Sequence, residues 1–307
     1  MTKRHAMLSE QKRVFKRVTE AAGLKSRSNR PASTFHLAAA PVAHPGTSQT
    51  IAAFAPATLV LVDVDADALG KLRDQLGQQR VLAVPVDVSS EGAMHQLFDQ
   101  IDREVGALDF VFNNAGIASG GEFQDYTFAD WKRLLDVNLW GVIYGSTFAY
   151  RCMLVRGTGH IVNVASLGGL IPEPMASAYS ASKHAVVGLT CSLREEAHAR
   201  GVRVSVVCPG VIDTPIFDRA TYAGHVDPKA VKQATLAHGA MAASDAAQII
   251  CKQVAKNTGI ILVNPSDRVF WGLYRASPRA LSPLHRYLSQ YFREHFELEQ
   301  PADPERP

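Results

Sequence analysis

A tyrosine and a lysine four residues apart, Tyr179 and Lys183, are the side chains in this sequence best suited to move a proton. On a helix, residues at this spacing project from the same face. A lysine ammonium beside a phenol favours the phenolate, so it lowers the pKa of the tyrosine towards the range of a useful acid/base group. The pair therefore suits proton exchange with an alcohol or a carbonyl. The spacing alone is weak evidence, because Tyr-x-x-x-Lys often arises by chance.

Two further polar residues strengthen this prediction. Ser166 directly follows the apolar run 161–165 and precedes Tyr179 by thirteen residues. The carboxyl end of a strand is where open α/β sheets bind ligands, so the Ser166 hydroxyl could hold and polarise a substrate oxygen. Asn138 lies inside a predicted helix, where an amide has no packing advantage. It could anchor a water molecule that relays protons to Lys183.

Two turn-like segments end predicted strands. One is Asn113-Asn114-Ala115-Gly116, and the other is Pro209-Gly210-Val211-Ile212-Asp213-Thr214. Because the carboxyl ends of parallel strands meet at one edge of a sheet, we expect both segments at the same edge as Ser166.

The elements that must position these residues alternate between strands and helices from about residue 57 onward. Short apolar runs predict strands at 58–62, 81–86, 108–112, 161–165, 202–208 and 260–263. Apolar spacing predicts amphipathic helices around 69–76 and 94–105 and longer helices at 128–154, 177–200 and 244–256. This alternation, without an internal repeat or a linker, predicts an α/β single domain with a doubly wound parallel sheet.

Composition narrows the classes of protein. Hydrophobic residues make up 47% and charged residues 20% of the 307 residues, so a substantial core is expected. Residues 1–30 contain nine Lys or Arg against two Glu, a balance of +7, and since the whole chain carries +3 the remainder is near −4. Such a body lacks the basic surface of a nucleic-acid-binding domain. No apolar stretch approaches the roughly 18 residues of a membrane span.

The four cysteines, Cys152, Cys191, Cys208 and Cys251, are far apart and show no metal-ligand or redox spacing. We therefore expect no metal site. A reduced, cytoplasmic protein is the simplest interpretation. The N-terminus is basic but lacks the apolar segment of a secretory signal.

The two ends of the chain depart from the α/β pattern. Residues 1–36 form a predicted basic, irregular extension, and residues 37–265 form the body. Residues 266–307 form a predicted helical arm and polar tail, with aromatic residues interleaved with Arg up to about residue 295. We expect this arm to pack on the body. A dimer contact and a membrane-surface helix are the alternatives.

Taken together, these residues resemble the short-chain dehydrogenase/reductase family in its single-domain form. The resemblance covers roughly residues 57–265 and rests on five motifs in the usual order, those around Asn114, Asn138, Ser166, Tyr179 and Pro209. It implies a Rossmann-like domain that transfers a hydride between a nicotinamide cofactor and a small-molecule alcohol or carbonyl compound.

The resemblance also implies roles for individual residues. Tyr179 would be the acid/base, and Lys183 would lower its pKa and bond the nicotinamide ribose. Ser166 would orient the substrate oxygen, and Asn138 would complete the proton relay. The matched cofactor positions are Asp87 and Val88 at the adenine, Asn114, Ala115 and Gly116 beside its ribose, Pro209 and Gly210, and Ile212 and Thr214 at the carboxamide.

Asp63 bears on the choice of cofactor, because it directly follows the apolar run 59–62. A carboxylate here can accept both hydroxyls of an adenosine ribose and would repel a 2′-phosphate. Val64 supplies no compensating cation. We therefore predict NAD rather than NADP. The alternative is that Asp63 only caps the following helix.

One family feature is missing. The phosphate-binding turn Thr-Gly-x-x-x-Gly-x-Gly should precede Asp63 by roughly 24 residues, because its glycines let the backbone approach the pyrophosphate. The window 37–46 offers only Gly46, and no clear first strand precedes it. Pro41 and Pro45 also remove backbone donors.

The missing turn supports an alternative function: a catalytically impaired protein of this fold that acts through binding or assembly. An altered reading frame over roughly residues 30–56 is one origin. Codons for Gly-Ala-Gly-Ser, shifted by one base, can read as Ala40-Pro41-Val42-Ala43.

Residues 213–241 are predicted to form a mobile lid over the substrate. Its residues Pro215, Ile216, Phe217 and Tyr222 suggest an apolar small-molecule alcohol or ketone. With the aromatic arm they also keep open a membrane-surface enzyme acting on lipid-like substrates. The family resemblance implies a homodimer or homotetramer, built partly from the helices of Asn138 and Tyr179.

Overall fold

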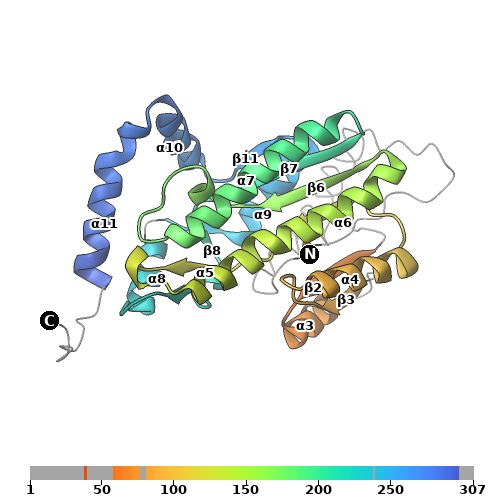
Figure 1. The fold of residues 1–307 in the computed structure, drawn as a ribbon, viewed down its shortest axis with the longest axis horizontal. Coiled ribbons are helices and arrows are strands. Elements are labelled where there is room, and N and C mark those ends of the chain that lie inside the picture. The colour runs from red at the N-terminus through yellow and green to blue at the C-terminus, as the bar shows by residue number, and fades with distance from the viewer. Residues whose placement is uncertain (1–37, 40–57, 77–80, 238, 297–307) are drawn as a thin grey trace, which may run out of the picture.

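The computed structural model describes residues 38–39, 58–76, 81–237 and 239–296. Its main body is one seven-stranded sheet in the order β11-β7-β6-β4-β1-β2-β3, and each neighbouring pair is parallel (Figure 1). The strands are β1 (Ala38–Ala39), β2 (Leu59–Asp63), β3 (Val81–Pro85), β4 (Phe110–Asn113), β6 (Gly159–Val164), β7 (Val202–Cys208) and β11 (Ile260–Leu262). The predicted doubly wound α/β fold is confirmed.

Helices cover both faces of the sheet. They are α3 (Ala66–Leu76), α4 (Glu91–Glu104), α5 (Phe128–Leu135), α6 (Gly141–Arg156), α7 (Ser177–His198) and α9 (Ala243–Ala255). Side chains of α4, α6 and α7 share one apolar cluster with the sheet, and those of α3 and α9 share another. Figure 1 shows the same two layers, with α6 and α7 in front of the sheet and α9 behind it.

Strand β2 shows why the sequence forms this sheet. Leu59 and Leu61 join the cluster of α3 and α9, whereas Val60 and Val62 join the cluster of α4 and α6. Successive side chains of a strand point to opposite faces, so a strand covered on both faces must be apolar throughout. Continuous apolar runs of this kind predicted the strands from residue 58 onward. The observed bounds of these strands differ from the predicted ones by a few residues at most.

The interpretation that no clear first strand precedes Gly46 was wrong. Ala38 of β1 pairs with Leu61 of β2 and with Phe112 of β4, so β1 lies in the middle of the sheet. Alanine has little intrinsic preference for strands, so the sequence of β1 does not indicate a strand. Its pairing with the apolar strands β2 and β4 stabilises the extended conformation. Residues 40–57, which include the window of the missing turn up to Gly46, lie outside the described residues.

The long helix predicted at 128–154 contains a break in its regular pattern. Between α5 and α6 lies a π-helical turn, η2 (Asp136–Trp140), in which the Gly141 N–H donates to the Asp136 carbonyl five residues back. Such turns occur frequently at functional sites. This one carries Asn138.

The predicted lid at 213–241 is tied down at both ends. Its segments are β8 (Ile212–Asp213), η4 (Pro215–Phe217), β9 (Thr221–Tyr222), α8 (Pro228–Ala237) and β10 (Met241–Ala242). β8 pairs with β10, and β9 pairs with β5 (Ser119–Gly120). Gly121 lies at φ +127°, and a Cβ there would come within 2.4 Å of the Ala223 carbonyl oxygen, so glycine is required where the lid meets the body.

The C-terminal arm consists of α10 (Pro265–Ala276), η5 (Pro278–Leu281) and α11 (Ser282–Phe296). Figure 1 shows α11 running alongside the body towards α8. The Asp227 N–H donates to the Phe296 carbonyl at 3.0 Å, and Arg293 forms an ion pair with Glu122. The arm is therefore packed on the lid side of the body. Among the described residues, no helix has the length and apolarity needed to cross a membrane.

Candidate active site

A cavity of about 630 Å³ opens beyond the carboxyl ends of β4, β6 and β7. It brings together most of the predicted site residues. Those that line it are Asn114, Gly116, Ser166, Tyr179, Lys183, Pro209, Gly210, Ile212 and Thr214. Asn138, Ala115, Asp63, Asp87 and Val88 lie outside its lining.

Tyr179 and Lys183 lie in the first two turns of α7. The Ser180 hydroxyl anchors this end of the helix by donating to the Gly168 carbonyl at 2.8 Å. Lys183 Nζ donates to the Val164 carbonyl at 3.1 Å and lies 5.6 Å from the centre of the Tyr179 ring. Burial lowers the pKa of Lys183 to about 8, because it disfavours the ammonium.

The pKa of Tyr179 moves opposite to the prediction from the sequence. Burial raises it most strongly, and the negative charge of Glu173 raises it further. Hydrogen bonding with Ser166 opposes this rise. Lys183 does not lower the pKa of the phenol here, and its ammonium is bonded to the Val164 carbonyl. In this structure desolvation of the phenolate is the dominant effect.

Ser166 connects β6 to the short 3₁₀ helix η3 (Leu167–Gly169). Its Oγ accepts a hydrogen bond from the Gly168 N–H at 3.2 Å, which fixes the direction of the side chain. The Leu167 N–H donates to the Pro209 carbonyl at 2.7 Å, so the turn after β6 is tied to the turn after β7. The hydroxyls of Ser166 and Tyr179 consequently face the same cavity.

Asn138 is completely buried, and both ends of its amide are used. Its Oδ1 accepts from the Ile117 N–H at 2.8 Å, and its Nδ2 donates to the Ile117 carbonyl at 3.0 Å and to Ser182 Oγ at 3.2 Å. Ser182 Oγ in turn donates to the Tyr179 carbonyl at 2.7 Å. Asn138 therefore holds the segment after β4 against α7, the helix that carries Tyr179 and Lys183.

The neighbouring asparagines Asn113 and Asn114 have different surroundings. Asn113 Nδ2 donates to Asn163 Oδ1 at 2.8 Å and to Ser146 Oγ at 3.2 Å, inside the core between β4, β6 and α6. Asn114 Nδ2 is buried and has no hydrogen-bond partner within the described part of the chain. Since buried amide groups are nearly always paired, Asn114 marks a place where a ligand is expected.

Gly116, two residues further on, is closely surrounded. A Cβ at this position would lie 3.2 Å from Asn138 Oδ1 and 3.4 Å from Lys183 Nζ. A glycine here leaves open the space in front of the Lys183 ammonium. The unpaired amide of Asn114 and this open space fit a bound nucleotide in the described half of the site.

Asp63 is the buried last residue of β2, and its Oδ1 accepts from the Asp65 N–H at 2.9 Å. The following helix is capped by Asp65 instead, whose Oδ1 accepts from the Ala68 N–H at 3.0 Å. Arg219 of the lid reaches Asp65 Oδ2 at 3.3 Å, across 154 positions of sequence. Because Arg219 is so distant in the sequence, the residues next to Asp63 gave no sign of this cation.

The predicted adenine contacts, Asp87 and Val88, follow β3, and Ala115 follows β4. Asp87 Oδ1 accepts from the N–H and hydroxyl of Ser89, at 2.9 and 2.7 Å. Val88 is buried and fits against Gly141, where a Cβ would come within 2.9 Å of it. Ala115 packs against the same apolar cluster.

A buried carboxylate that the sequence analysis missed supports the turn after β7. Asp267 of α10 accepts from the Gly210 N–H at 2.9 Å and from the Asn264 N–H at 3.2 Å. A Cβ on Gly210 would lie 2.6 Å from Asp267 Oδ1. Gly210 and Asp267 are 57 positions apart in the sequence, which explains why no local pattern revealed the contact.

Much of the remaining cavity lining is apolar, and the arm supplies a large part of it. Its side chains include Ile216 and Phe217 of the lid, Phe270 of α10, and Leu284, Leu288, Phe292 and Phe296 of α11. The sequence predicted a helical arm with aromatic residues interleaved with Arg, but the structure alone places the apolar side chains of α11 in the cavity lining.

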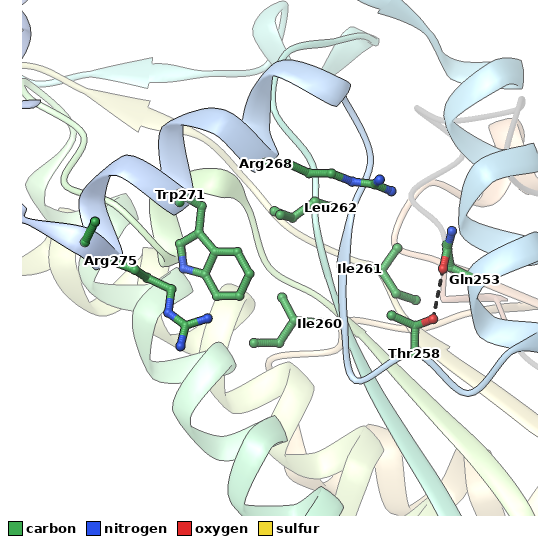
Figure 2. Close-up of a pocket in the computed structure, with 10 residues that line it drawn as sticks. Gln253, Thr258, Ile260, Ile261, Leu262, Arg268, Trp271 and Arg275 are labelled. Atoms are coloured by element: carbon green, nitrogen blue, oxygen red, sulfur yellow. Dashed lines mark hydrogen bonds between the residues drawn. The ribbon is translucent and has the colours of Figure 1, made fainter.

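A second cavity, of about 640 Å³, lies between β11 and α10 (Figure 2). Arg268, Trp271 and Arg275 line it, and the Arg275 guanidinium lies 4.9 Å from the Trp271 ring. It shares no lining residue with the first cavity, and none of the predicted site residues lines it. Tyr179 and Lys183 therefore belong to the first cavity alone.

Comparisons with known proteins agree with this geometry. The short chain dehydrogenase family matches residues 47–223. SadH of Mycobacterium tuberculosis is 40% identical over 176 residues, which cover 56% of this chain and 63% of that protein. An uncharacterized oxidoreductase of Staphylococcus aureus (strain MRSA252) is 35% identical over 166 residues, 54% of this chain and 71% of that protein.

Solved structures show the same fold. A short chain dehydrogenase/reductase from Burkholderia phymatum, in complex with NAD, superimposes with a TM-score of 0.73 at 28% identity and covers 80% of this chain and 94% of its own. A short-chain dehydrogenase from Sphingobium yanoikuyae, in complex with NADPH, gives 0.67 at 20% identity and covers 90% and 100%. The site and fold define an α/β oxidoreductase. The chain belongs to the short-chain dehydrogenase/reductase family.

Proposed function

We propose that this protein is a nicotinamide-dependent oxidoreductase that interconverts a small-molecule alcohol and its carbonyl compound, with NAD as the preferred cofactor. One observation carries the proposal: Ser166, Tyr179 and Lys183 line the same cavity as the unpaired amide of Asn114. A general acid, an oxygen-binding hydroxyl and a buried ammonium are the groups that reduction of a carbonyl requires.

Each residue has a distinct role in this reaction. A bound nicotinamide supplies or accepts the hydride. Tyr179 gives a proton to the carbonyl oxygen in reduction and takes it from the alcohol in oxidation. Ser166, held by Gly168, binds that oxygen. Lys183 supplies positive charge below the phenol and donors for the ribose, and Asn138 fixes the segment of Gly116 beside it.

In this proposal the cofactor would lie along the carboxyl ends of the strands. Asp63 would accept from the adenosine ribose, while Asp87 and Val88 would flank the adenine. Asn114, Ala115 and Gly116 would line the middle of the cofactor site. The nicotinamide end would be formed by Pro209, Gly210, Ile212 and Thr214, together with Tyr179 and Lys183. We favour NAD because Asp63 repels a 2′-phosphate.

The substrate class follows from the apolar part of the cavity lining. Because Phe270, Phe292 and Leu288 line the cavity, a substrate with an apolar body gains from leaving water. We therefore propose an apolar alcohol or ketone, admitted through the lid.

The decisive test is steady-state activity with NAD across a panel of secondary alcohols, with Tyr179→Phe as the comparison. The substitution keeps the ring and removes the proton. We expect it to lower kcat by about 10²- to 10⁴-fold. Activity that survives the substitution would contradict the proposed role of Tyr179.

A second candidate function is a catalytically impaired protein of this family that binds a partner or assembles. It rests on the sequence of residues 37–46, which lacks the glycines of the phosphate-binding turn. Titration of NADH, followed by nicotinamide fluorescence, separates the two functions. Failure to bind NADH at millimolar concentration would support the second one. Reading the coding DNA tests the altered frame, which is excluded if no single-base shift restores a glycine turn.

We further propose that the protein is a homo-oligomer that uses the helices α5–α6 and α7. Phe128 and Val155, at opposite ends of α5–α6, are 94% and 90% exposed, and Trp140 between them is also exposed. Exposed apolar side chains along one pair of helices are typical of a subunit contact. Analytical ultracentrifugation tests this, and a monomer at micromolar concentration would contradict it.

A further inference from the structure

Glu173 is a carboxylate of the catalytic cavity to which the proposed reaction gives no role. It lies in the loop between η3 and α7 and lines the cavity. This loop is held in place, because the Gly121 N–H donates to the Met175 carbonyl at 2.7 Å and Met175 adopts a left-handed φ of 62°. A non-glycine residue keeps such a conformation only where its surroundings enforce it.

The carboxylate rests against Gly168, next to Ser166. The three atoms nearest to a Cβ built on Gly168 all belong to Glu173, and the closest, Oε2, would be 2.0 Å away. A side chain at this position would require the Glu173 carboxylate to move. Its charge reaches the reacting group, since it raises the pKa of Tyr179. Glu173 therefore lies beside the place where a substrate oxygen would bind.

Within the described part of the chain, no side chain pairs with this carboxylate. No hydrogen bond or ion pair joins it to another described residue. Lys183 and His285 are the basic side chains that line the cavity, and Lys183 donates to the Val164 carbonyl instead. Glu173 is an exposed residue that lines the cavity. Desolvation of its carboxylate by the neighbouring protein raises its pKa.

A carboxylate that lines a largely apolar cavity without a counter-charge loses its hydration when a ligand fills the cavity, which costs free energy. A ligand that brings a positive charge removes this cost. Hydrogen bonds between two ionised groups are also roughly twice as strong as those between neutral groups. The rest of the cavity is lined largely by apolar side chains, so the remainder of the ligand is apolar.

We propose that Glu173 selects substrates carrying a protonated amine next to the reacting carbon, so that the preferred substrates are apolar amino alcohols or amino ketones. This inference rests on the proposed oxidoreductase function. It has a second consequence for the same site. A substrate ammonium offsets the negative charge that opposes ionisation of Tyr179, so binding of the amine also favours removal of the alcohol proton.

The test compares two substrates of equal size, 1-amino-2-octanol and 3-nonanol, in which a methyl group replaces the amine. The wild-type protein is expected to oxidise the amino alcohol with a kcat/KM about tenfold or more above that of 3-nonanol, as for a desolvated charge pair. In Glu173→Gln, this ratio should fall to about one. An equal ratio in the wild-type protein, or an unchanged preference in the variant, would overturn the inference.

Two further variants control for indirect effects. Glu196→Gln removes one negative charge from the exposed surface of the same α7 helix and should keep the preference. Gly168→Ala keeps the charge but displaces the carboxylate from its seat, so it should reduce the preference without removing Glu173. A preference that is lost in Glu196→Gln as well would contradict a specific role of Glu173.

A binding measurement separates this inference from the proposed function. Isothermal titration calorimetry compares octylammonium with 1-octanol on the wild-type protein and on Glu173→Gln. Tighter binding of octylammonium, lost in the variant, supports the role of Glu173 even if neither alcohol is oxidised, in which case the oxidoreductase proposal alone fails. Equal binding of the two ligands to the wild-type protein overturns the role of Glu173.

Discussion

Two regions, the proposed catalytic end of the site around α7 and the proposed nucleotide end around β2 and β3, use their ionisable side chains in different ways. At the catalytic end, Tyr179 and Glu173 face a cavity and have pKa values raised mainly by burial. At the nucleotide end, Asp65 is partly exposed, and hydrogen bonding with Ala68 lowers its pKa. Asp87 there is held by Ser89.

This difference reflects what each end has to do. For a group that exchanges protons, a desolvated surrounding makes the balance between the charged and neutral forms depend strongly on neighbouring charges. A group that holds a ribose or an adenine needs a fixed direction, which local hydrogen bonds provide. The catalytic end is therefore sensitive to single charges, whereas the nucleotide end is sensitive to the shape of its turns.

The largest effect is expected from substitution at the catalytic end. Tyr179→Phe should lower kcat by about 10²- to 10⁴-fold and leave NADH binding within about threefold, because the phenol acts in proton transfer. Stopped-flow single-turnover rates and NADH fluorescence titration measure the two quantities. A parallel loss of NADH binding would show that Tyr179 mainly holds the cofactor.

At the nucleotide end, Asp63→Ala should raise KM for NAD by about 10- to 100-fold, the cost of losing charged hydrogen bonds to a ribose. It should affect KM for NADP less, because the repulsion of a 2′-phosphate is also lost. Asp67→Asn, at an exposed acidic residue in the first turn of α3, is the matched control. An equal change in KM for NAD and for NADP would mean that Asp63 does not distinguish the two adenosine riboses.

The pH dependence of the reaction rates tests the proposed role of Tyr179 without a substitution at that residue. Alcohol oxidation needs the Tyr179 phenolate, and the pKa of Tyr179 is raised, so the oxidation rate should increase with pH by about tenfold per unit through the alkaline range. Carbonyl reduction needs the protonated phenol and should stay constant around neutrality. In Glu173→Gln, loss of the negative charge should move the alkaline rise to lower pH. A rise unchanged by this substitution would contradict the electrostatic link.

The smallest effect is expected where the lid meets the nucleotide end. Arg219 and Asp65 form an ion pair whose side chains are 53% and 35% exposed. Because such exposed pairs contribute about 0–1 kcal/mol, Arg219→Ala should change KM for NAD by less than about fivefold and leave the melting temperature nearly unchanged. A larger change in KM would assign Arg219 to cofactor binding.

Much of the fold and of the catalytic pair could be predicted from local patterns. β7 was predicted with its observed bounds, Val202–Cys208, because a parallel strand covered on both faces has to be apolar throughout. β1 escaped prediction, because two alanines carry no strand signal and their pairing partners come from elsewhere in the chain. The predicted helix at 128–154 was found, but its π-turn at Asn138 depends on contacts with Ile117 and Ser182.

The sequence by itself determined the chemistry available to this protein: a tyrosine and a lysine on one helix face, a serine at a strand end, and an acidic residue after the second strand. Their types and spacing are local properties of the chain. In a helix or a strand, the spacing of two residues determines whether their side chains project from the same face. The family resemblance follows from the same residues.

The tertiary structure alone decided the surroundings of these groups. It set Glu173 against Gly168, Asp267 against Gly210 and the apolar side chains of α11 in the cavity lining. These contacts join residues that are distant in the chain or lie in an irregular loop, where no periodic pattern reports them. Since burial and neighbouring charge control the pKa of Tyr179, the packing of the whole domain sets how readily this phenol exchanges its proton.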